Sequence, residues 1–137
     1  MRAVLDANAF ISALLAPGGS PAAVLRGWIE GAYELVTSPL LLEELERALA
    51  YPKLRTRVRQ EEAVAFVDLL RHGTQHLDDP EASETIRSPD PDDEYLIALA
   101  EGAQAVIVSG DAHLLGLAPS VPVYSPTQFL DLLEDSA

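Results

Sequence analysis

Short apolar runs alternate along the chain with longer segments that have the period of an α-helix, and this alternation restricts the fold most. Strands that alternate with helices favour a parallel sheet built from right-handed βαβ units and covered by helices on both faces. We therefore expect an α/β fold, a three-layer α/β/α sandwich with a central parallel sheet of four to five strands. The apolar runs are Ala3–Leu5, Tyr33–Thr37, Thr74–Leu77, Ala105–Val108 and Val121–Tyr124. Of these, Ala105–Val108 is continuously apolar, which is typical of a strand buried on both faces.

Helix boundaries are indicated by a recurring dipeptide, Ser-Pro. A serine N-cap followed by proline at the first helical position is a favourable helix start. The dipeptide predicts helices that begin at Ser20-Pro21, Ser38-Pro39 and Ser125-Pro126. Further helices are expected over Asn8–Leu15, over Gln60–His72, and from Asp90 to Glu101 with Gly102 as the stop.

Length and composition describe one globular domain over residues 1–137. A chain of this size buries about two-thirds of its unfolded surface, so it needs no disulfide or metal to hold a core. It has no cysteine, which excludes disulfide scaffolds, thiolate zinc sites and cysteine nucleophiles. We find no signal-peptide pattern and no apolar run near the about 20 residues of a membrane helix. We expect a cytoplasmic protein with no membrane contact.

The charge balance is strongly acidic, with 22 Asp and Glu residues against 9 Lys and Arg residues and a formal net charge of −13. This argues against a general polyanion-binding protein, because neutralising phosphates requires Lys and Arg. The excess acid could gather divalent cations, attract a basic protein partner, or simply keep the surface soluble.

Four acids fall at the carboxyl edge of the predicted sheet. Asp6 directly follows the first apolar run, and Asp111 comes three residues after the fourth. Asp93 lies in the first turn of a predicted helix, and Glu44 lies about one and a half turns into the helix after the second run. In open parallel sheets the functional crevice lies beyond the carboxyl ends of the strands. We therefore expect these four carboxylates to converge.

Each of these acids also has a purely structural explanation. Asp6 and Asp111 could cap the helices that follow them. Asp93 could belong to a capping arrangement, and Glu44 could be a solvated helix residue. The convergence of all four at one edge is what favours a site.

A metal explains such a cluster physically. Carboxylates within about 5 Å of each other raise one another's pKa and destabilise the fold unless a cation neutralises them. Oxygen donors alone favour Mg²⁺ or Mn²⁺ over Zn²⁺. Because Mg²⁺ keeps several waters, one of them can attack a phosphodiester, and the metal attracts the phosphate that bare carboxylates would repel. The sequence thus predicts one or two Mg²⁺ or Mn²⁺ ions.

With these residues the sequence resembles the PIN-domain ribonucleases found as toxins in VapC-type toxin–antitoxin pairs. The stretches that carry the resemblance are VLDANAFISALL, TSPLLLEELERAL, SPDPDDEYLIALA and AVIVSGDAHLL, in an order and spacing that cover nearly the whole chain. The resemblance assigns the metal-binding and catalytic acids to Asp6, Glu44, Asp93 and Asp111, and supporting positions to Asn8, Ser12 and Ser109. It implies Mg²⁺- or Mn²⁺-dependent endonucleolytic cleavage of RNA, frequent homodimerisation, and inhibition by a small antitoxin protein in the active-site groove.

Several positions leave alternatives open. Ala7 stands where the family often has Thr, which removes a hydroxyl beside Asp6, whereas Ser109 replaces Thr and keeps a hydroxyl near Asp111. Glu44 is preferred over Glu43 because of the following leucine and the helical phase, and Glu43 remains an alternative. Two further acids of the stretch SPDPDDEYLIALA, Asp90 and Asp92, could be auxiliary acids or cap and surface residues.

A second class of function also fits the composition: a non-catalytic acidic module that docks a basic protein partner. The one basic run, Lys53, Arg55, Arg57 and Arg59, bears on the choice. If it flanks the acids, it could hold an RNA backbone. Otherwise it is a solvated helix start.

Overall fold

The computed structural model describes residues 1–80 and 93–136, and its centre is a five-stranded sheet in the order β3-β2-β1-β4-β5. All four neighbouring strand pairs are parallel. The strands are β1 (Arg2–Leu5), β2 (Glu34–Thr37), β3 (Gln75–His76), β4 (Val106–Val108) and β5 (Val123–Tyr124). The expected parallel sheet is confirmed, and the run Thr74–Leu77 forms its edge strand β3.

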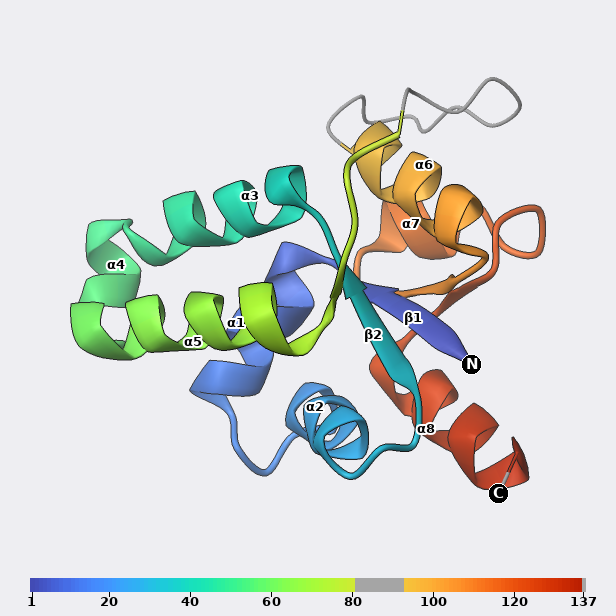
Figure 1. The fold of residues 1–137 in the computed structure, drawn as a ribbon. Coiled ribbons are helices and arrows are strands. Elements are labelled where there is room, and N and C mark those ends of the chain that lie inside the picture. Colours follow the sequence, from blue (N-terminus) through green and yellow to red (C-terminus); the bar gives the residue numbers. More distant parts are fainter. Residues whose placement is uncertain (81–92, 137) are drawn as a thin grey trace.

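Helices cover both faces of this sheet. They are α1 (Ala7–Leu15), α2 (Ser20–Ile29), α3 (Pro39–Leu49), α4 (Pro52–Arg55), α5 (Gln60–Gly73), α6 (Glu94–Ala103), α7 (Ala112–Leu115) and α8 (Pro126–Ser136). Helix α6 packs against β1 and β4, while α1 packs against α2 and α3, and α3 packs against α5. Figure 1 shows α3, α4 and α5 on one side of the strands and α6 and α7 on the other. The three-layer α/β/α sandwich is confirmed.

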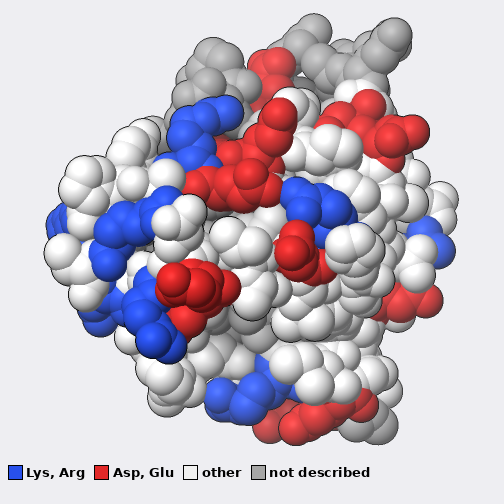
Figure 2. Space-filling view, turned by 60° about the vertical axis from the view of Figure 1, so that its left-hand side comes forward, with Lys and Arg blue, Asp and Glu red and all other residues white. Residues whose placement is uncertain are grey.

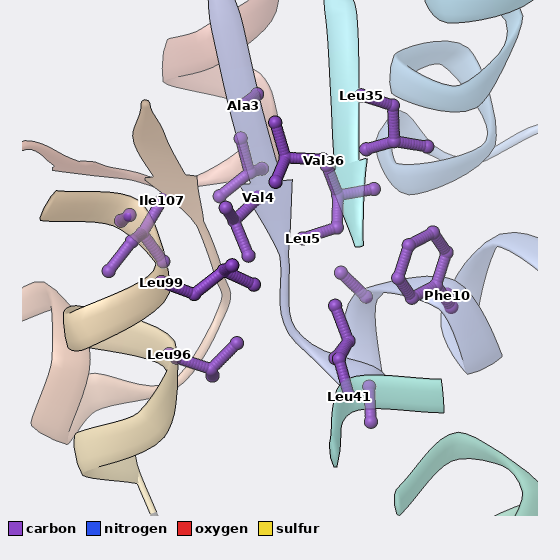
Figure 3. Close-up of a cluster of buried hydrophobic side chains, with 14 of the residues drawn as sticks. Ala3, Val4, Leu5, Phe10, Leu35, Val36, Leu41, Leu96, Leu99 and Ile107 are labelled. Atoms are coloured by element: carbon purple, nitrogen blue, oxygen red, sulfur yellow. The ribbon is translucent and has the colours of Figure 1, made fainter. Parts of the chain in front are cut away.

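The core lies on both sides of the central strands. Figure 3 shows Leu96 and Leu99 of α6 on one side of β1, and Phe10 and Leu41 on the other. Such a leucine contributes about 1.5–3 kcal/mol when it is fully buried. In β4, Ile107 and the residue after it are fully buried, as expected for a continuously apolar run. The apolar runs therefore form the middle layer because both of their faces are covered.

Two of the three predicted Ser-Pro helix starts are confirmed. The Ser38 side chain accepts a hydrogen bond from the Leu41 amide at the start of α3. Ser125 and Gln128 cap α8 reciprocally, each amide donating to the other's side chain. At α2 the prediction is wrong, because Gly19 is the N-cap and Ser20 is already helical. Pro21 is therefore the second residue of the helix and not the first. It is tolerated there because the first four amides of a helix have no carbonyl partner within the helix.

The boundaries of α6 also differ from the prediction. Its expected start at Asp90 lies outside the described residues, and the described helix has Asp93 at its N-cap. The helix does not stop at Gly102 but continues to Ala103, which is 3% exposed. It ends at Gln104, whose φ of 54° is left-handed. The helix extends past the exposed Gly102 because this buries the apolar side chain of Ala103. The glycine in the sequence did not indicate this later end.

The helices of the described part are short. None of them is by itself long and apolar enough to cross a membrane, and α1 and α2 meet that criterion only as a pair bent by 99°.

Candidate active site

The register between β1 and β4 brings two acid-bearing segments together. Leu5 pairs with Val108, so the residues that follow them, Asp6 and Ser109, are neighbours beyond the carboxyl ends of the strands. The buried Ser109 hydroxyl donates to Asp6 Oδ2 at 2.5 Å and accepts from the Asp111 amide at 2.9 Å. One serine hydroxyl therefore links the ends of both strands.

Asp6 is 6% exposed and caps α1, since its Oδ1 accepts from the Ala9 amide at 2.8 Å. Burial raises the pKa of Asp6, the hydrogen bonds from Ser109 and Ala9 lower it, and the charges of Asp111 and Glu44 raise it further. Capping thus does not exclude a site. Asp111 and Glu44 therefore lie close enough for their charges to act on the Asp6 carboxylate, and we call these three carboxylates the acidic rim.

Helix α3 turns Glu44, and not Glu43, toward this rim. Glu44 is half-buried and accepts a hydrogen bond from the Tyr95 hydroxyl of α6, whereas Glu43 is exposed. Leu45, next in the helix, is fully buried and fixes the rotation of α3 about its axis. The preference for Glu44 on helical phase therefore agrees with the geometry.

Two residues near the rim were not singled out from the sequence. Burial, followed by the hydrogen bond to Glu44 and the charges of Glu44, Asp6 and Asp79, raises the pKa of Tyr95. Its phenol therefore stays protonated and acts as a donor. Asp79 accepts from the Leu40 amide at 2.9 Å, and its buried Oδ1 has no hydrogen-bond partner in the described structure. No spacing in the sequence marks either residue as part of a site, because only the fold brings them next to α3.

The remaining candidates lie around a groove of about 320 Å³ beside the rim. Asn8 and Ser12 line it together with Asp111. In the described structure Asp6 accepts hydrogen bonds from Ala9, Phe10 and Ser109, and the support of Asp6 by Asn8 stays a prediction. Asp111 is half-buried and caps α7 by accepting from the His113 amide at 2.9 Å. The groove therefore opens onto the rim at Asp111.

Asp93 is half-buried at the N-cap of α6, two residues before Tyr95. Its place in the metal-binding set stays a prediction, and Asp90 and Asp92 lie outside the described residues. Among the described side chains, no three Asp, Glu or His groups are arranged to hold one ion together. Glu44 is instead turned toward Tyr95, and Asp6 toward Ser109. Carboxylate oxygens are donors that suit a hard cation such as Mg²⁺.

The comparisons with known proteins agree with this architecture. The chain matches the model of the PIN domain over residues 2–113, and it therefore belongs to the PIN-domain family. It is 30% identical over 117 residues to an uncharacterized protein of Methanocaldococcus jannaschii, covering 85% of this chain and 75% of that protein. The resemblance seen in the sequence is confirmed at the level of the family.

Solved structures show the same fold. VapBC2 of Rickettsia felis, bound to a promoter DNA fragment, has a TM-score of 0.63 at 14% identity, covering 91% of this chain and 98% of that chain. VapBC-1 of nontypeable Haemophilus influenzae has a TM-score of 0.64 at 16% identity, covering 93% and 99%. PAE2754 of Pyrobaculum aerophilum has a TM-score of 0.65 at 22% identity, covering 98% and 90%.

Proposed function

We propose that this protein is a metal-dependent endoribonuclease that serves as the toxin of a toxin–antitoxin pair. One observation carries the proposal: the acidic rim gathers Asp6, Glu44 and Asp111 from three separate segments, close enough for two of them to raise the pKa of the third. A buried carboxylate with a raised pKa is destabilising as an anion, and folds retain such groups chiefly where they have a task.

The cation would be held by the acidic rim, with Asp93 as a further ligand from α6. All of these donors are carboxylate oxygens, which favour Mg²⁺ or Mn²⁺, as one or two ions. When bound, the metal would supply a polarised water and positive charge for phosphodiester hydrolysis. The chain's own part is to orient the ligands: Ser109 fixes Asp6, and Tyr95 fixes Glu44.

The groove lined by Asn8, Ser12 and Asp111 gives the substrate an approach to the rim. Asn8 and Ser12 are exposed, so their polar side chains are available to an RNA backbone. RNA is the substrate that membership of the PIN-domain family favours, and the structures of VapBC complexes support an antitoxin as the partner. We propose further that the chain acts in the cytoplasm as a homodimer.

A cleavage assay with the variant Asp6→Asn tests this proposal. Asparagine is also a good N-cap, so the variant should remain folded while losing a charged ligand. We expect RNA cleavage by the purified protein to fall about 10³-fold, and to stop for the wild type when a chelator is added. Cleavage that survives either change contradicts the proposal.

The alternative, an acidic module that binds a basic protein without cleaving RNA, makes the opposite prediction. In that case Mg²⁺ leaves thermal stability unchanged, and neutralising the acids weakens only partner binding. The burial of Asp6 favours the metal site, because an anion meant for docking a protein would be exposed.

A further inference from the structure

The corner where α3 meets α4 carries an unusual charge distribution. Residues 47–60 contain five of the nine Lys and Arg residues of the chain and none of its 22 Asp and Glu residues. Figure 1 shows α4 at the outer ends of α3 and α5, away from the sheet. In Figure 2 most of the Lys and Arg on the visible face gather in its left-hand part. A positive corner therefore stands out on an otherwise acidic protein.

Four of the five cations of this corner form no ion pair within the described structure. Arg47, Lys53, Arg55 and Arg57 are exposed, and none of them takes part in an ion pair within the described structure. Arg47 stays unpaired although Glu43 stands four residues before it, a favourable spacing for a helical ion pair.

Three acids near this corner are paired with other bases. Arg71 holds Glu46 at 2.8 Å and Asp68 at 2.9 Å, and Arg59 holds Glu62 at 2.9 Å. The charges of these pairs largely cancel at a distance. Within the described structure the four unpaired cations outnumber the two nearby acids that form no ion pair, Glu43 and Glu61.

An exposed aromatic residue lies among these cations. Tyr51 is 60% exposed and sits at the N-cap of α4, between Arg47 and Lys53 in the chain. Proteins that bind single-stranded nucleic acid combine backbone-binding cations with aromatic faces on which bases stack. We call Arg47, Tyr51, Lys53, Arg55 and Arg57 the basic corner.

Helix α3 connects the basic corner to the acidic rim. Glu44 of the rim lies about one and a half turns into α3, and Arg47 follows it by three residues, about one helical turn. The eleven residues of α3 span about 16 Å. An RNA strand that is cut at the rim could therefore extend along α3 and reach the corner within a few nucleotides.

We propose that the basic corner is a docking surface for single-stranded RNA that holds the substrate on one side of the cleaved bond. The four cations contact phosphates, and Tyr51 stacks on a base. This inference rests on the proposed ribonuclease function, but it concerns RNA binding and not the metal-dependent step.

Binding of a labelled single-stranded RNA of about 12 nucleotides tests the docking surface, since such sites cover roughly 4–16 nucleotides. The full chain carries Asp6→Asn so that nothing is cleaved, and Mg²⁺ is held constant. Replacing the four cations by Gln should weaken binding and make the salt dependence of log K shallower by about 0.7 for each lost phosphate contact. The double variant Arg2→Gln/Arg26→Gln removes two cations outside the corner, and it should leave the slope unchanged, whereas Arg55→Gln/Arg57→Gln, which removes two corner cations, should make it shallower.

Tyr51 should act differently from the cations. Tyr51→Ala is expected to weaken single-strand binding about tenfold without changing the salt slope, because stacking involves no counterion release. Tyr51→Phe keeps the aromatic face and should bind like the parent. Duplex RNA of the same length has no free base face, so Tyr51→Ala should not affect its binding.

The outcomes separate the two proposals. If the parent protein does not bind RNA, if the salt slope of the cation variant equals that of the parent, or if Tyr51→Ala binds single strands as well as the parent, the docking surface is overturned. Binding that depends on the corner in a protein whose wild type never cleaves RNA would overturn only the ribonuclease proposal.

Discussion

The acidic rim and the basic corner, which α3 connects, hold their charges in opposite environments. At the acidic rim, Asp6 is 6% exposed, and both of its oxygens accept hydrogen bonds. At the basic corner, Arg47 and Lys53 are exposed and form no ion pair with any described residue. At the rim, the electrostatic free energy therefore depends on a few buried charges. At the corner, it is the sum of small contributions from several exposed charges.

This difference determines how each region should respond to change. Charges near buried groups are weakly screened by salt, so a single substitution at the rim has a large effect. Exposed charges are screened within about 8–10 Å at ordinary ionic strength, so the corner acts through the sum of small terms. The following predictions, from the largest effect to the smallest, test whether the rim behaves in this way.

The largest effect is expected at Glu44. Glu44→Gln removes a charged ligand that the fold turns toward the rim, and RNA cleavage should fall about 10³-fold. Glu43→Gln is the matched control on the same helix, where the side chain is exposed, and it should change cleavage less than about twofold. Equal losses in the two variants would show that the rotation of α3 does not select the ligand.

Metal binding should stabilise the wild type strongly. A cation that binds only the folded state adds about 2.7 kcal/mol at 100 times its Kd. Thermal unfolding with and without Mg²⁺ or Mn²⁺ should show this gain for the wild type and lose most of it in Asp6→Asn. An equal gain in both proteins would place the ion away from Asp6.

A smaller effect is expected for Tyr95→Phe, which removes only the hydroxyl that donates to Glu44. Groups that orient a metal ligand typically contribute 10–100-fold to affinity, and we expect about tenfold weaker metal binding by calorimetry. The variant Tyr51→Phe loses an exposed hydroxyl with no hydrogen bond in the described structure, and its metal affinity should be unchanged. Unaltered affinity in Tyr95→Phe would mean that Glu44 needs no positioning.

The smallest effect is the pH dependence of the metal-free protein. Because the pKa of Asp6 is raised on folding from 3.8, the native state binds more protons than the unfolded state as pH rises above about 4. Asp6 should therefore lower the free energy of unfolding through this range, and Asp6→Asn should remove that decline. Chemical unfolding at several pH values in the presence of a chelator measures this decline. If the free energy of unfolding changes with pH in the same way in both proteins, the pKa of Asp6 is not raised by burial.

Local sequence patterns determined most of the fold. Apolar runs predicted the strands because a strand covered on both faces must exclude polar residues. Ser-Pro pairs predicted two helix starts because capping needs only neighbouring atoms. The predicted start of α2 was wrong because a helix tolerates proline at its second position. The predicted end of α6 was wrong because one more residue buries Ala103.

The site was determined only in part by the sequence. It indicated Asp6 and Asp111 because each follows a strand, and Glu44 through its helical phase. Only the tertiary structure decided that the Ser109 hydroxyl bridges two strand ends and that Tyr95 reaches Glu44. It also decided that Asp79 lies near α3 and α6. These contacts join residues as many as 103 positions apart, and side chains that meet only through packing leave no periodic trace in the sequence.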